Sequence, residues 1–134
     1  MKNYLLAALL ITSAMINAQH ETETIDNEKI YMVVDEMPSF PGGEKQLIQF
    51  LKANLKYPPR EKAAQITGDC YITFVVEKDG AIHHMKMLKG VEDGAGCDQE
   101  VMRVMNLMPA WKPGKHHGTV VRTQYNLPIR FILY

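Results

Sequence analysis

The C-terminal stretch constrains the fold of this chain more than any other segment. From residue 121 to residue 133 the odd positions are mostly apolar, and most even positions are polar. Side chains on a strand alternate between two faces, so this period predicts one long strand with a buried face and a wet face. The odd positions are Val121, Thr123, Tyr125, Leu127, Ile129, Phe131 and Leu133.

Pro128 indicates where this strand lies in its sheet. Proline has no N–H, so within a sheet it lies on an edge, with the missing donor facing away from the neighbouring strand. In an antiparallel ladder the backbone groups of same-parity residues point to the same side. The even residues are therefore expected to face an open edge. Because a long open edge invites pairing with another strand, this edge is the leading candidate for a binding site.

The first 18 residues have the pattern of a secretory signal peptide. Lys2 supplies a positive start, residues 4–16 are apolar except for Thr12 and Ser13, and Ala18 precedes the expected cleavage site. The alternative is an uncleaved membrane anchor, but this apolar run is shorter than the ~20 residues that a spanning helix needs. We expect residues 19–36 to be a flexible N-terminal segment and residues 37–134 to form the domain.

Length and charge limit the function further. The chain has 134 residues, room for one domain, and a formal charge of zero. Removing residues 1–18 takes away one lysine and no acid, so the net charge stays close to zero. A net charge near zero predicts neither nucleic acid nor an anionic membrane as a partner. Export to an oxidising compartment and the even cysteine count favour a disulfide between Cys70 and Cys97. The alternative is two buried free thiols.

Apolar spacing predicts the remaining elements. A helix is expected over residues 43–54, one or two further turns over 60–65, a central strand over 70–76, a return strand over 81–88 and a second helix from Cys97 to Met108. Asp79 and Gly80 form a hairpin turn between the two strands. The apolar positions of the return strand change parity, which predicts a β-bulge near His83 and His84.

These elements predict an α+β fold, a two-layer sandwich in the order α-β-β-α-β. Three antiparallel strands form a small sheet, and both helices lie on one face. A right-handed crossover places the last strand beside residues 70–76 and antiparallel to them. The last strand then forms one edge of the sheet and residues 81–88 form the other.

Neither a metal site nor a catalytic site is expected. His83, His84, His116 and His117 occur as adjacent pairs, and adjacent residues on a strand point to opposite faces, so neither pair chelates a metal. No carboxylate or cysteine completes a zinc ligand set. Ser39 has no visible base. We therefore predict that the protein is not an enzyme and binds no cofactor. The histidines are expected to be exposed to solvent.

Three segments of the sequence resemble a known family. They are FPGGEKQLIQFLKANLKYP, GDCYITFVVEKDGAI and GCDQEVMRVMNLMPAWKPGKHHGTVVRTQYNLPIRFIL. In this order and spacing they are similar to the TonB C-terminal domain, in the version common in Bacteroidetes-type bacteria. The resemblance covers residues 37–133. Its most specific pieces are residues 40–58, 74–80, 108–114 and 127–129.

The resemblance implies a periplasmic module that binds a short peptide, the TonB box, of outer-membrane transporters. In that family the peptide adds as a strand to the edge formed by the last strand. Residues 122–130 would supply the backbone pairing, with polar contacts from two even residues and two odd residues packed beneath. The expected binding residues are Arg122, Gln124, Tyr125, Asn126, Leu127, Pro128 and Arg130.

The sequence also departs from full-length members of that family, which pass force from an inner-membrane proton motor through a transmembrane helix and a Pro-rich linker. Here the N-terminal apolar run is short, and residues 19–36 contain no proline. We expect a stand-alone exported domain in the periplasm, associated with the inner membrane if the leader stays attached. Proton-motor proteins remain possible partners. The alternative is a homodimer, or a regulatory or scaffold domain without energy transduction.

Overall fold

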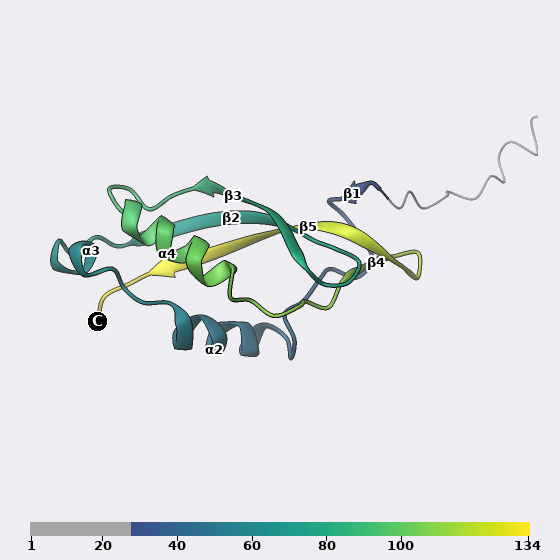
Figure 1. Ribbon diagram of the computed structural model, residues 1–134, viewed down its shortest axis with the longest axis horizontal. Coiled ribbons are helices and arrows are strands. Elements are labelled where there is room, and N and C mark those ends of the chain that lie inside the picture. The colour runs from purple at the N-terminus through teal and green to yellow at the C-terminus, as the bar shows by residue number, and fades with distance from the viewer. Residues whose placement is uncertain (1–27) are drawn as a thin grey trace, which may run out of the picture.

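The computed structural model describes residues 28–134, and the predicted signal peptide and residues 19–27 lie outside them. The described part has an α+β fold, as predicted, with a curled sheet and three helices (Figure 1). In chain order the elements are β1 (Ile30–Tyr31), α2 (Glu44–Asn54), α3 (Pro59–Ala63), β2 (Gly68–Val76), β3 (Ile82–Lys89), α4 (Ala95–Met105), β4 (Gly114–His116) and β5 (Thr119–Phe131).

The sheet is larger than predicted. Its strand order is β1-β5-β2-β3, and β4 also pairs with β5. The expected antiparallel pairing of β5 with β2 is confirmed, from Gly68 opposite Phe131 to Val76 opposite Thr123. The prediction of three strands is wrong because it missed β1 and β4. These strands have two and three residues, too few to show a period, and only contact with β5 makes them strands.

The hairpin of β2 and β3 has the predicted turn and the predicted bulge. Gly80 has a φ of 86°, and its N–H donates to the carbonyl of Glu77 at 2.9 Å. Between the pairs Thr73–Lys86 and Val75–His83, β2 advances by two residues and β3 by three. The extra residue lies near His84, whose φ is 54°. This bulge explains why the apolar positions of β3 change parity along the strand.

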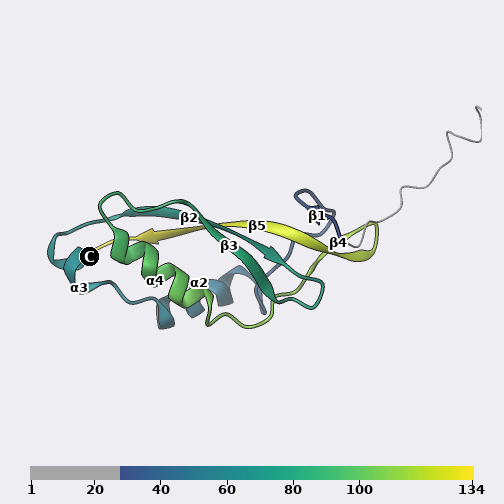
Figure 2. The same cartoon turned by 45° about the horizontal axis from the view of Figure 1, so that its top comes forward.

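The core lies between the sheet and the helices. Figure 2 shows α2 and α4 on the same side of the sheet, as predicted. Leu47 of α2 and Val101 of α4 pack in one cluster with Phe74 of β2 and Ile129 of β5. Along β5 the predicted alternation is confirmed at the buried odd positions, which are Val121, Thr123, Leu127, Ile129 and Phe131.

Helix α4 is fixed at its beginning by a carboxylate from α3. Glu61 is only 3% exposed, and its Oε1 accepts a hydrogen bond from the N–H of Gly96 at 3.1 Å. The first N–H groups of a helix have no partner within the helix, and a carboxylate there also complements the helix dipole. The short helix α3 therefore positions α4 beneath the sheet.

Trp111 fastens the segment between α4 and β4 to the core. Its backbone N–H donates to the carbonyl of Gly80 at 2.9 Å, and the residue is 3% exposed. The ring makes edge contacts with Phe40, Phe74 and Tyr125 at centroid distances of 5.8, 5.2 and 5.1 Å. Trp111 therefore lies against the turn of the β2–β3 hairpin.

The two cysteines are free thiols in the structure, so the favoured disulfide is not formed there. Cys70 of β2 and Cys97 of α4 are both 0% exposed and belong to the hydrophobic core cluster. Burial raises the pKa of each thiol to about 11. They occupy the core as small apolar side chains, which was the alternative interpretation.

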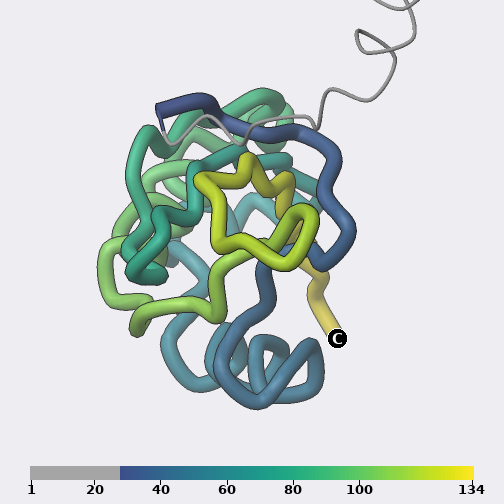
Figure 3. Tube along the Cα trace, turned by 90° about the vertical axis from the view of Figure 1, so that its right-hand side faces the viewer, coloured from purple at the N-terminus to yellow at the C-terminus, as the bar shows by residue number. Residues whose placement is uncertain are grey.

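The folded part begins before residue 37, so the predicted boundary of the flexible segment at residue 36 is wrong. Tyr31 is 6% exposed and pairs with Thr123 of β5 in parallel. Glu36 exchanges two backbone hydrogen bonds with Lys115, at 3.0 and 2.9 Å. Figure 3 shows this N-terminal arm, residues 28–36, beside the hairpin of β4 and β5.

Candidate functional site

The outer edge of β5 is the candidate site, and it is divided along its length. On its inner side β5 pairs with β2 from Thr123 to Phe131. On its outer side β1 pairs with Arg122 and Thr123. Within residues 28–134, no further strand pairs with the outer side of residues 124–131. This stretch is the free edge.

Pro128 decides which backbone groups the free edge presents. It lies opposite Tyr71, in a ladder that runs from Val76 to Gly68 without a register shift. A proline fits that place only if its nitrogen points away from β2. The backbone groups of the even residues then point outward. Asn126 and Arg130 thus offer an N–H and a carbonyl at the edge, and Pro128 offers a carbonyl alone. The parallel bridge between Tyr31 and Thr123 turns the N–H of Gln124 toward β1, so Gln124 offers a carbonyl alone.

The even side chains point to the face of the sheet opposite the helices. Gln124 is half-buried, whereas Asn126, Pro128 and Arg130 are exposed. Arg130 makes two hydrogen bonds to the carboxylate of Asp69, at 2.8 and 3.3 Å. These bonds hold the pKa of Asp69 below its usual value. Arg130 is therefore already paired within the domain.

Arg122 has a different place from the one predicted. Its guanidinium makes two hydrogen bonds to Glu77, at 2.7 and 3.0 Å, and a third to the carbonyl of Glu28 at 2.8 Å. The bonds from Arg122 are the main reason that the pKa of Glu77 is lowered, and His83 adds to the effect. Arg122 thus ties the N-terminal arm to β5 and β2, at the point where β1 covers the edge.

The two odd residues of the predicted site lie beneath the edge. Leu127 is 5% exposed and belongs to the core. Tyr125 is half-buried, and its ring packs against Phe74 at 5.6 Å and against Trp111 at 5.1 Å. Burial raises the pKa of Tyr125. Both residues support the strand from below.

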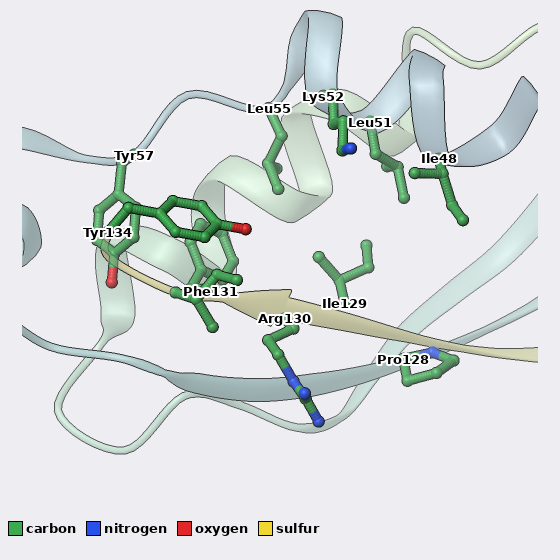
Figure 4. A pocket seen from close by; sticks show the side chains of 11 residues that line it. Ile48, Leu51, Lys52, Leu55, Tyr57, Pro128, Ile129, Arg130, Phe131 and Tyr134 are labelled. Atoms are coloured by element: carbon green, nitrogen blue, oxygen red, sulfur yellow. The ribbon is translucent and has the colours of Figure 1, made fainter. Parts of the chain in front are cut away.

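A groove of about 470 Å³ beside the free edge was not found from the sequence. It lies between α2 and the end of β5 (Figure 4). Its helix side consists of Ile48, Leu51, Lys52 and Leu55, spaced i, i+3, i+4 and i+7, which places them on one face of α2. That spacing was the available signal, but the sequence pattern alone assigns an apolar helix face to the core.

The geometry can be compared with known proteins. A family model described as Gram-negative bacterial TonB protein C-terminal matches residues 53–133. The chain belongs to this family. The match covers α3, β2, β3, α4, β4 and β5, so the candidate edge of this TonB C-terminal domain lies within it.

Two further comparisons complete this result. The NMR solution structure of the Helicobacter pylori TonB C-terminal domain has 15% sequence identity and a TM-score of 0.46. That likeness covers 70% of this chain and 87% of the other. No curated protein matches the sequence.

Other classes of site were also considered. Within residues 28–134, no three His, Cys, Asp or Glu side chains are grouped to hold a metal ion. His83 lies 3.3 Å from Glu77, and His116 and His117 lie 3.7 and 3.9 Å from Asp35. The helices of this TonB C-terminal domain, over the same residues, are all too short or too polar to cross a membrane.

Proposed function

We propose that this chain is a TonB-type interaction domain that binds a short extended peptide of an outer-membrane transporter. The peptide, a TonB box, adds as a strand to the outer edge of β5, and the domain works in the periplasm. The observation that carries this proposal is the free edge at residues 124–131, next to a stretch where the same edge already accepts β1 in parallel pairing. Family membership supports the same mechanism.

The proposal assigns different roles to the seven predicted residues. Gln124, Asn126, Pro128 and Arg130 present backbone groups to the peptide. Tyr125 and Leu127 pack beneath the strand and support it. Arg122 sets the end of the site, because the N-terminal arm covers the edge there. The domain acts by binding and has no catalytic role.

The test is an NMR titration of residues 19–134 with N-terminal peptides of the host's outer-membrane transporters. We expect amide shifts concentrated at residues 124–131, with smaller changes on β3, which forms the opposite edge of the sheet. Saturable binding that leaves β5 unshifted would refute the site. Absence of binding by every transporter peptide, with a concentration-dependent mass, would favour pairing of two copies of the chain instead.

A further inference from the structure

Met108 lies between α4 and Trp111, and its thioether contacts the indole ring. The Nε1–H of Trp111 donates to the Sδ of Met108 at 3.3 Å. A thioether is a weak acceptor, but sulfur beside an aromatic ring is a favourable contact. Nε1 is the one polar atom of the Trp111 side chain. Met108 therefore supplies the partner for the polar atom of a residue that is only 3% exposed.

The thioether of Met108 can be reached from solvent. Met108 is half-buried and lines a hollow of about 280 Å³ between the end of α4 and β3. Met85 is also half-buried and lines the same hollow, whereas Met105, which lines it too, is 2% exposed. A hollow of this size holds several water molecules. Hydrogen peroxide is little larger than water, so it can reach the sulfur of Met108.

The two thiols of the core do not compete for an oxidant. Cys70 and Cys97 are 0% exposed, and burial raises the pKa of each to about 11. Peroxide reacts with the thiolate and needs access to it. Both thiols therefore stay reduced in the folded protein, and an oxidant that enters the hollow meets thioethers.

Oxidation of Met108 would break its contact with Trp111. The sulfur gives an electron pair to one peroxide oxygen, the O–O bond breaks, and the other oxygen leaves as water. The sulfoxide oxygen does not fit between Sδ and Nε1, because 3.3 Å is already a contact distance. With the oxygen turned away, an electron-poor sulfur faces the N–H donor. A sulfoxide also places a polar group among apolar side chains, so Trp111 has to shift.

We propose that Met108 is a reversible oxidation site and that its sulfoxide displaces Trp111 from the core. The ring of Trp111 packs against Tyr125 at 5.1 Å, and Tyr125 lies beneath the free edge of β5. Displacement of Trp111 therefore removes support from that edge and weakens peptide binding under oxidising conditions. This last effect rests on the proposed function, whereas oxidation of Met108 and movement of Trp111 do not.

The test is treatment of the full chain with hydrogen peroxide, which oxidises thioethers and leaves indole rings intact. Trp111 is the single tryptophan of the chain, so fluorescence reports its surroundings alone. We expect mass mapping to find one added oxygen on Met108, the fluorescence maximum to move to longer wavelength and the urea midpoint to fall. Methionine sulfoxide reductase should reverse all three changes, because it returns the sulfoxide to the thioether.

Three variants separate Met108 from the other methionines. Met108→Leu keeps the size of the side chain but has no sulfur, so peroxide should leave its fluorescence and urea midpoint unchanged. Met85→Leu removes the other half-buried sulfur of the hollow. Met32→Leu with Met37→Leu removes two methionines that are 65% and 47% exposed before α2. The last two variants should respond to peroxide as the unaltered chain does.

The outcomes separate the oxidation site from the peptide edge. Met108 that stays unmodified while Met32 is fully oxidised would overturn the proposal, as would a Met108 sulfoxide that leaves the fluorescence maximum in place. Equal shifts in Met108→Leu and the unaltered chain would also overturn it. A shifted maximum with unchanged affinity for transporter peptides would keep the oxidation site and refute its link to the edge. No peptide binding before oxidation would count against the proposed function alone.

Discussion

Gly80 is the residue at which the β2–β3 turn meets the segment that carries Trp111. Its φ of 86° belongs to the left-handed region, and a Cβ there would overlap the carbonyl oxygen of Trp111. We expect Gly80→Ala to reduce the free energy of unfolding by about 3 kcal/mol, through backbone strain and displacement of Trp111. Urea denaturation measures this loss.

Gly118 provides the matched control. Its φ is 76°, and nothing lies within 4 Å of the position of a Cβ. Gly118→Ala should therefore show only the conformational cost, about 1 kcal/mol. Equal losses of unfolding free energy in Gly80→Ala and Gly118→Ala would mean that overlap with Trp111 adds nothing to the cost of a side chain at Gly80.

The outward backbone groups of β5 can be tested one at a time. Asn126→Pro removes an N–H from the free edge and is expected to abolish peptide binding while the fold persists, because that N–H does not pair with β2. Pro128→Ala adds an N–H and should tighten binding several-fold, about the contribution of one hydrogen bond. Calorimetric titration measures both affinities. Loss of the folded amide spectrum in Asn126→Pro would contradict the parity assigned to β5.

At the scale of elements, Arg122 connects β5, β2 and the N-terminal arm. Its hydrogen bonds lower the pKa of Glu77 in the folded state. Such a carboxylate stabilises the fold fully above its unfolded pKa of about 4.3, and this contribution is lost as the pH falls through the lower, folded pKa.

We therefore expect the free energy of unfolding to fall on acidification below about pH 5. The fall should be shallower in Glu77→Gln, which has no carboxylate to protonate at this position. Glu92→Gln changes an exposed carboxylate in the loop after β3 and serves as control. Denaturant titrations at several pH values give the slope of the unfolding free energy against pH. The same slope in Glu77→Gln and the unaltered chain would contradict the role given to Glu77.

The arm offers a second prediction at this scale. Tyr31→Ser removes a buried ring that lies 5.5 Å from the ring of His116, and it should cost about 2 kcal/mol of stability. If β1 covers outward groups of β5, amide hydrogen exchange at Arg122 should accelerate in this variant. Thr123, which pairs with Val76, should remain protected. Equal acceleration at both amides would argue for a general loosening of β5.

Elements formed by interactions between residues close in the sequence could be predicted, and elements formed by distant residues could not. β5 was predicted because its alternation is written into consecutive residues, and the bulge near His84 because Ile82 and Met85 differ in parity. β1 and β4 form only against a strand about 90 residues away or across a tight hairpin. The groove was missed for a related reason: Ile48 is apolar but turns toward β5 at the surface, which a helical period cannot distinguish from the core.

At the scale of the whole molecule, the two thiols report on global unfolding. Cys70 and Cys97 are fully buried with pKa values raised to about 11, and only the thiolate reacts. Labelling by a thiol reagent at pH 8 should be slow in the folded protein and should follow the urea unfolding curve. Rapid labelling of the folded chain would contradict this burial. If neither Cys70 nor Cys97 reacts with the reagent even in denaturant, the two cysteines form a disulfide instead.

The parallel pairing of β1 with β5 has a mechanical consequence. The arm and a peptide on the free edge would be attached to the same strand, end to end, so tension between them would run lengthwise through β5. The nine residue pairs between β5 and β2 would bear that load together in shear. The two pairs of β1 would be the weaker connection, and the arm would peel away before the peptide-bearing strand left the sheet.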